Sequence, residues 1–160
     1  MVSMRSRRDV LINGALAGGL LALPRFSLAV EHAWSTLRPP PGQRTFSSPA
    51  VEETLLRIRA TVGDAQLAWL FENCYPNTLD TTVTLGELDG KPDTFIVTGD
   101  IPAMWLRDSS AQVWPYLPLA RSDEALRRMF QGLVHRHARC ILIDPYANAF
   151  QRDPDRKSVV

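Results

Sequence analysis

The feature that most constrains the fold is a long run of helix-period apolar residues in the second half of the chain. Ser122–Asp123 is a pair suited to capping a helix, and apolar side chains then recur every three or four residues until Asp144–Pro145. The face comprises Leu126, Met129, Leu133, His137 and Cys140, with Phe130, Val134 and Ile141 beside them. This pattern predicts one long amphipathic helix, which must bury its apolar face against other elements.

Shorter helices are predicted nearer the N-terminus. Apolar side chains recur at helical spacing over residues 51–62, and Gly63 follows as a helix end. Asp64 is a good N-cap for a second helix, which stops before Pro76. A further helix is expected over residues 103–113.

Two β-branched segments, residues 81–85 and 94–98, predict a small hairpin with Asp89–Gly90 in its turn. Two strands alone are not stable, so the hairpin must lie against the helices. No alternation of strand, helix and strand is present, which argues against a doubly wound sheet. The predicted fold class is therefore mainly α with a small β-hairpin.

The first 29 residues follow the order of an export signal. They contain four arginines against one aspartate, and the pair Arg7 and Arg8 precedes an apolar run over 10–23. That run is shorter than the roughly 20 residues that cross a membrane, so no permanent membrane anchor is expected. The alternative, a basic N-terminus ahead of a buried helix, is disfavoured by three glycines in the run. The arginine pair indicates the twin-arginine export machinery as a partner and a periplasmic or extracellular location.

Composition and charge exclude several other classes. With 45% hydrophobic and 22% charged residues the chain is typical of a globular protein, and its net charge of +1 leaves the part after the signal weakly acidic. Without a basic stripe, nucleic acid is not an expected partner. Cys74 and Cys140 lack the close Cys or His partners of a zinc site, and two buried free thiols are favoured over a disulfide. His135 and His137 point in different directions on a helix, so no metal site is expected.

The most informative segment is residues 98–110, TGDIPAMWLRDSS, where a Gly/Pro loop enters a helix. An Arg next to an Asp and close to a Trp suits a sugar, because the carboxylate accepts from two neighbouring hydroxyls, the guanidinium donates to others and the indole packs on the C–H face. The alternative is a helix start at which Asp108 is a local cap and Arg107 makes a surface ion pair. Spacing alone leaves both interpretations open.

Residues 98–117 closely resemble the signature of glycoside hydrolase family 125, the metal-independent exo-acting α-mannosidases. Residues 71–82 and 144–150 resemble two further segments of that family in the same order, and the similarity spans roughly residues 50 to 154. The resemblance implies that the chain supplies the N-terminal part of an (α/α)6 barrel. It also implies hydrolysis of non-reducing-end α-1,6-linked mannose with inversion, an α-mannoside oligosaccharide as substrate, and no metal or other cofactor.

By the same resemblance, Arg107 and Asp108 bind the terminal mannose and Trp105 shapes the wall of the pocket. Asp100 is expected beside them. The weaker candidates for substrate binding are Asn77, Asp80 and Asn148. For the two asparagines, turn-forming or helix-capping amides are an equal alternative. Trp114 is expected in the core, because it lies among apolar neighbours and precedes a proline.

No catalytic acid or base is assigned to this chain. An inverting glycosidase needs two carboxyl groups about 6.5 to 9.5 Å apart, and in the family these are expected beyond residue 160. Twelve barrel helices need roughly 200 residues at least. The chain is therefore expected to be inactive alone and, with inward helix faces uncovered, prone to aggregate.

The expected organisation is a twin-arginine signal peptide, an extended leader, part of the catalytic domain and a short non-native tail. These segments are 1–29, 30–49, 50–154 and 155–160. The tail is assigned because its sequence resembles a translated sequencing adapter. Two other functions stay open: another (α/α)6 exo-glycosidase, or a carbohydrate-binding protein without catalysis.

Overall fold

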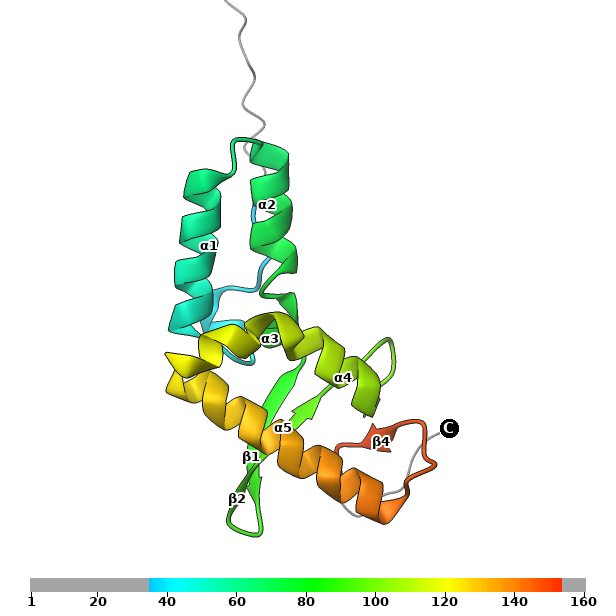
Figure 1. Ribbon diagram of the computed structural model, residues 1–160. Helices are drawn as coiled ribbons and strands as arrows, with labels where there is room; N and C mark the ends of the chain where they lie inside the picture. Colours follow the sequence, from blue (N-terminus) through cyan, green and yellow to red (C-terminus); the bar gives the residue numbers. More distant parts are fainter. Residues whose placement is uncertain (1–34, 154–160) are drawn as a thin grey trace, which may run out of the picture. The chain divides into compact units, whose positions relative to one another are not determined.

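Five α-helices and two small antiparallel sheets make up residues 35–153, the part of the chain that the computed structural model describes (Figure 1). The helices are α1 (Pro49–Thr61), α2 (Ala65–Cys74), α3 (Asn77–Thr81), α4 (Leu106–Val113) and α5 (Glu124–Ile143), with 3-10 helices η1 (Pro41–Gln43) and η2 (Trp114–Arg121). The strands are β1 (Val83–Leu88), β2 (Lys91–Ile96), β3 (Ala103–Met104) and β4 (Phe150–Gln151). The mainly α fold with a small hairpin is confirmed. The predicted signal 1–29 and tail 155–160 lie outside the described residues.

Helices α1 and α2 begin where their capping residues predict. The Ser48 hydroxyl accepts from the Val51 N–H at 3.2 Å, and the Asp64 carboxylate accepts from the N–H groups of Gln66 and Leu67 at 2.8 and 3.0 Å. Each cap satisfies backbone donors that the first helical turn leaves free. The two helices lie side by side in Figure 1.

The hairpin turn is tighter than the five-residue loop expected from sequence. Asp89 and Gly90 have φ of 51° and 72°, the left-handed pair that a two-residue turn requires. Because these two residues alone reverse the chain, Leu88 pairs with Lys91 and the strands continue through most of the predicted loop. The hairpin is confirmed, and its strands are longer at the turn end than predicted.

Helix α5 packs directly across this hairpin (Figure 1). Gly132 makes the approach possible, because a Cβ there would lie 2.9 Å from the backbone carbon of Asp93 and from the nitrogen of Thr94. The Thr94 hydroxyl donates to the Met129 carbonyl at 2.9 Å. The Arg136 side chain, which is 5% exposed, forms an ion pair with Asp93. Helix and strand are therefore joined by both close packing and buried polar contacts.

The expectation of one helix over residues 103–113 is wrong at its start. Ala103 and Met104 form β3, in which Met104 pairs with Phe150 of β4. Trp105 has extended backbone angles, and its N–H donates to the Thr98 hydroxyl at 2.8 Å. These pairings, which are not local in sequence, hold the chain extended until α4 begins at Leu106.

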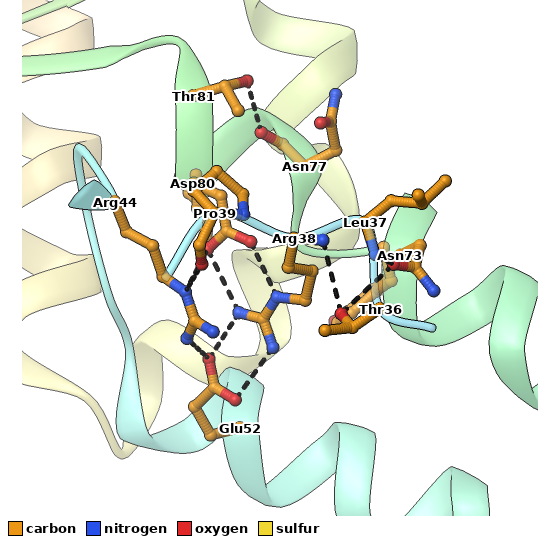
Figure 2. A network of polar contacts seen from close by, with 12 residues as sticks. Thr36, Leu37, Arg38, Pro39, Arg44, Glu52, Asn73, Asn77, Asp80 and Thr81 are labelled. Atoms are coloured by element: carbon orange, nitrogen blue, oxygen red, sulfur yellow. Dashed lines mark hydrogen bonds and ion pairs between the residues drawn. The ribbon is translucent and has the colours of Figure 1, made fainter. Parts of the chain in front are cut away.

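The described part of the predicted leader is packed against the domain, so the expectation of an unpacked segment is wrong for these residues. Figure 2 shows the contacts that Arg38 makes. Its guanidinium donates to Asp80 at 2.7 and 3.1 Å and to Glu52 at 2.6 and 3.0 Å. Arg44 donates to Glu52 at 3.0 Å, and the Thr45 N–H donates to the Asp80 carbonyl at 2.9 Å. Charged side chains therefore attach this segment to α1 and α3.

The start of α1 is also tied to the start of α5. The Ser48 hydroxyl donates to the Asp123 carboxylate at 2.6 Å, and the same carboxylate accepts from the Leu126 N–H at 3.0 Å. Burial by itself would raise the pKa of Asp123, but the hydrogen bonds from Ser48 and from backbone N–H groups lower it overall. The carboxylate thus serves as the N-cap of α5 and as the partner of the N-cap of α1.

The core lies between the hairpin, α5 and η2. Its buried apolar members include Leu79, Val83, Ile96, Met104, Val113, Tyr116, Leu126, Met129 and Phe150. Trp114 is 70% exposed, so the expectation that it lies in the core is wrong. Residues three apart share a face of a 3-10 helix, and burying Val113 and Tyr116 turns Trp114 outward.

Both cysteines are free, as favoured from sequence, but only Cys140 is buried and Cys74 is exposed. Several other large apolar side chains are exposed, among them Tyr146 at 93% and Leu142 at 86%. Within residues 35–153, no helix has the length and apolar character needed to cross a membrane.

Candidate functional site

The loop that leads into α4 is fixed by its backbone. Thr98 is 2% exposed, and its N–H donates to the Ala103 carbonyl at 2.9 Å, which closes the loop. Gly99 has φ of 76°, a value that L side chains rarely adopt, and it supplies the sharp turn after β2. The Thr98 hydroxyl accepts from the Trp105 N–H, so the residue before α4 is anchored to the start of the loop. This loop presents the first turn of α4 in one defined position.

That first turn carries the two strongest candidates from sequence. The side chains of Arg107 and Asp108 are 89% and 45% exposed, and a guanidinium nitrogen lies 3.3 Å from a carboxylate oxygen. Asp108 is not the N-cap, because Trp105 holds that position without a side-chain cap. An acidic side chain in the first turn is favoured by the helix dipole. The pair therefore presents a planar donor and an acceptor together at the surface.

Trp105, Asp100 and Asn148 come close to this turn in different ways. Trp105 is half-buried directly before α4, and Asp100 is exposed in the loop ahead of β3. Asn148 is exposed two residues before Phe150, and the pairing of Phe150 with Met104 brings it toward the start of α4. The fold thus gathers candidates from two segments that are distant in sequence.

Asn77 and Asp80 lie on a separate element, α3. Asp80 is 2% exposed, and its two oxygens accept from Arg38, which gives it a structural role at the N-terminal segment. Asn77 is exposed at the start of α3, where its carbonyl accepts from the Thr81 hydroxyl at 2.7 Å. Both border a pocket of about 310 Å³ whose wall includes Trp69. Their role in substrate binding stays a prediction.

A second layer under the Arg107–Asp108 turn was not assigned from sequence. Ser109 is fully buried; its hydroxyl donates to the Leu106 carbonyl at 3.1 Å and lies 2.9 Å from His137 Nε2. Burial lowers the pKa of His137, which favours the neutral ring. The signal in the sequence was a histidine on an otherwise apolar helix face, which needs a polar partner when buried.

Asp100, Arg107, Asp108 and Asn148 belong to three different segments and show no arrangement for holding a metal ion. Within residues 35–153, no group of three or more His, Cys, Asp or Glu side chains is so arranged. What the turn offers chemically is hydrogen bonding of a polar ligand, with donors from a guanidinium, acceptors from a carboxylate and an indole nearby.

A mainly helical fold that presents Arg, Asp and Trp at one helix start is of the class formed by helical glycoside hydrolases. The sequence profile of glycoside hydrolase family 125, the metal-independent α-mannosidases, matches residues 64–159. The chain belongs to this family.

Two relatives show how much of a family member the chain represents. The meiotically up-regulated gene 157 protein of Schizosaccharomyces pombe is 48% identical over 115 residues, which are 71% of this chain and 23% of the relative. A solved metal-independent α-mannosidase from Streptococcus pneumoniae, in a non-productive complex with α-1,6-mannobiose, is 47% identical with a TM-score of 0.60. That match covers 68% of this chain and 25% of the other. The chain thus spans about a quarter of the length of these relatives.

Proposed function

We propose that this chain supplies part of the mannose-binding site of an exo-acting glycoside hydrolase. The enzyme removes non-reducing-end α-1,6-linked mannose by metal-independent inverting hydrolysis. The observation that carries the proposal is the exposed Arg107–Asp108 pair, held on an anchored turn inside the segment that resembles the family signature. The similar Streptococcus pneumoniae enzyme, in complex with α-1,6-mannobiose, supports the choice of sugar and linkage.

The geometry of the pair suits a ligand that presents several hydroxyls. The Asp108 carboxylate can accept from two neighbouring hydroxyls of one sugar ring, and the Arg107 guanidinium can donate to a ring or hydroxyl oxygen. In the free protein these side chains bind each other across 3.3 Å. An ion pair this exposed is worth only about 0–1 kcal/mol, so a sugar can compete for both groups. Trp105 supplies an apolar surface for the C–H face of the ring.

Binding is the part of the reaction that we assign to these residues. Inversion needs a general acid at the leaving oxygen and a general base that activates water on the opposite face. Asp108 already faces Arg107, an arrangement suited to holding hydroxyls, and it is given neither role. We propose that the acid and the base lie in polypeptide beyond residue 160, and that residues 1–160 alone do not hydrolyse mannosides.

The test uses the polypeptide encoded by the resequenced locus. Hydrolysis of α-1,6-mannobiose is measured with EDTA present for wild type, Arg107→Ala and Asp108→Ala. The matched controls are Arg127→Ala and Glu124→Ala, which disrupt another exposed ion pair, on α5. A hydrogen bond to a charged group contributes about 1.5–3 kcal/mol, so each site variant should lose about 10- to 100-fold in kcat/KM while the controls stay near wild type.

Other outcomes point elsewhere. Full activity in both site variants contradicts the assigned binding role. Binding of mannobiose without hydrolysis by a folded protein indicates a carbohydrate-binding protein, and hydrolysis of a different α-linked sugar indicates another exo-glycosidase. Separately, the 160-residue chain expressed alone should show no hydrolysis, and turnover by it would place an acid and a base within these residues.

We also propose that the protein is exported by the twin-arginine pathway to the periplasm or beyond. The support is the arginine pair ahead of a short apolar run, which lies outside the described residues. Replacing Arg7 and Arg8 together with lysine should leave precursor in the cytoplasm, as seen by fractionation and immunoblotting. The Arg5→Lys variant is the matched control, and equal export of the double variant would refute this route.

A further inference from the structure

The turn that carries Arg107 and Asp108 is held from beneath by a chain of two hydrogen bonds. The Ser109 hydroxyl has a single hydrogen, which it donates to the Leu106 carbonyl at 3.1 Å. His137 Nε2 lies 2.9 Å from the same oxygen and must therefore be the donor in that contact. The hydrogen-bond chain runs from His137 through Ser109 to Leu106. Its two ends on α4, Leu106 and Ser109, flank Arg107 and Asp108 in sequence.

His137 stands on the most firmly packed element near the site. One helical turn earlier on α5, Gly132 and Leu133 are buried, and Gly132 touches the hairpin backbone. The adjacent Arg136 is held by Asp93 of β2. His137 itself is half-buried, and burial lowers its pKa, which favours the neutral ring. A rigid platform thus contacts α4 through one imidazole nitrogen.

We propose that His137, acting through Ser109, is a positioning residue that sets the orientation of the Arg107–Asp108 pair toward the terminal sugar. This inference rests on the proposed function of that pair. Long exposed side chains gain specificity when the backbone beneath them is fixed, and small displacements at a binding site weaken the bound state strongly. Thr98 fixes the residue before α4, and the His137–Ser109 contact fixes its first turn.

A merely structural role makes a different prediction. A buried polar pair that only satisfies its own hydrogen bonds would affect the unfolding temperature and leave the sugar affinity of the folded protein unchanged. A positioning role requires sugar affinity to respond while the protein stays folded, and to recover when a donor is restored at the same place. Glutamine has an amide N–H of similar reach to Nε2, whereas leucine has similar size and no donor.

The experiment measures KM and kcat for α-1,6-mannobiose, together with the melting temperature, on the polypeptide encoded by the resequenced locus. The variants are His137→Leu, His137→Gln, Ser109→Ala and the double variant His137→Leu/Ser109→Ala. The matched control is His135→Leu, two residues away on α5, whose ring contacts the Pro92 carbonyl at 3.0 Å. We expect His137→Leu and Ser109→Ala each to raise KM about 5- to 10-fold, the double variant to be no worse than either, and His137→Gln to restore most of the loss.

Three results would overturn the inference: an unchanged KM in His137→Leu with a lowered melting temperature, no recovery in His137→Gln, or an equal KM rise in His135→Leu. The Arg107→Ala variant separates this failure from that of the proposed function. If Arg107→Ala raises KM and His137→Leu does not, only the positioning role is lost. If wild type neither binds nor hydrolyses the mannobiose, or if Arg107→Ala leaves KM unchanged, the binding site and the inference fall together.

Discussion

Replacing Arg38 with methionine should release the N-terminal segment from the domain. The Arg38 side chain is 6% exposed and contacts Asp80, which is 2% exposed, through two hydrogen bonds (Figure 2). Methionine keeps much of the apolar stem and removes the guanidinium. The Asp80 carboxylate would then remain buried, with Arg44 as its nearest listed cation at 3.7 Å.

The size of the effect follows from the charge left behind. Removing one partner of a buried ion pair costs about 3–5 kcal/mol, and we expect about 2–4 kcal/mol because Arg44 can move toward Asp80. The opening of this segment is reported by the Thr45 N–H, which donates to the Asp80 carbonyl at 2.9 Å. At about 1.4 kcal/mol for each factor of ten, protection of that amide against hydrogen exchange should fall about 30- to 1000-fold.

The assay is native-state hydrogen exchange of the Thr45 amide. The control is Arg59→Met, which removes an exposed arginine 3.5 Å from Glu72 and should change protection by less than a factor of about five. Adding Asp80→Asn to Arg38→Met should recover part of the loss, because the uncompensated charge disappears. Unchanged protection in Arg38→Met, or an equal loss in Arg59→Met, would refute the reasoning.

Acidification tests the same contact from the carboxylate side. The hydrogen bond from Arg38 is the main cause that lowers the pKa of Glu52. A lowered pKa in the folded state means that the stabilisation is present above the unfolded pKa, about 4.3, and is lost as pH falls through the folded value. Protection of Thr45 should therefore fall below about pH 4 in wild type, and this acid-dependent loss should be smaller in Arg38→Met.

Three further substitutions test the packing, a helix cap and the hairpin turn. Gly132→Ala should lower stability by about 1–3 kcal/mol in urea denaturation, because its Cβ would meet the backbone at Thr94, whereas Gly63→Ala meets nothing and should not. Asp123→Asn should lower the melting temperature at pH 7 and flatten its acid dependence, because hydrogen bonds lower the pKa of this carboxyl and its contribution is lost only as pH falls through the folded value. Gly90→Ala, at φ 72°, should cost about 1 kcal/mol in the same urea assay. An unchanged value in any of these measurements contradicts the corresponding reasoning.

The features predicted correctly from sequence depend on chemistry within a few residues. Asp64 and Asp123 mark helix starts because each accepts from N–H groups two or three positions ahead. Asp89–Gly90 marks the turn because both residues tolerate positive φ. Such signals need no knowledge of the rest of the fold.

The features that were missed depend on pairs far apart in the chain. β3 forms because Met104 meets Phe150, and the N-terminal segment packs because Arg38 meets Asp80, 42 residues away. The contact between Ser109 and His137 spans 28 residues. In each case one partner has an ordinary local sequence, so neither the pairing nor the burial is visible before the chain is folded. The candidate Arg107–Asp108 pair was found because both members are adjacent.

The shared cap between α1 and α5 has a consequence for the order of folding. Ser48 and Asp123 are separated by 75 positions, and closing a loop of that length costs about 4 kcal/mol of chain entropy. A nascent chain emerging from the ribosome lacks Asp123 while α1 is already complete in sequence, so the first helix waits for the last before its N-terminus is secured. The N-terminal half is therefore exposed to chaperones and proteases during synthesis, until the beginning of α5 arrives and both helices are capped in one step.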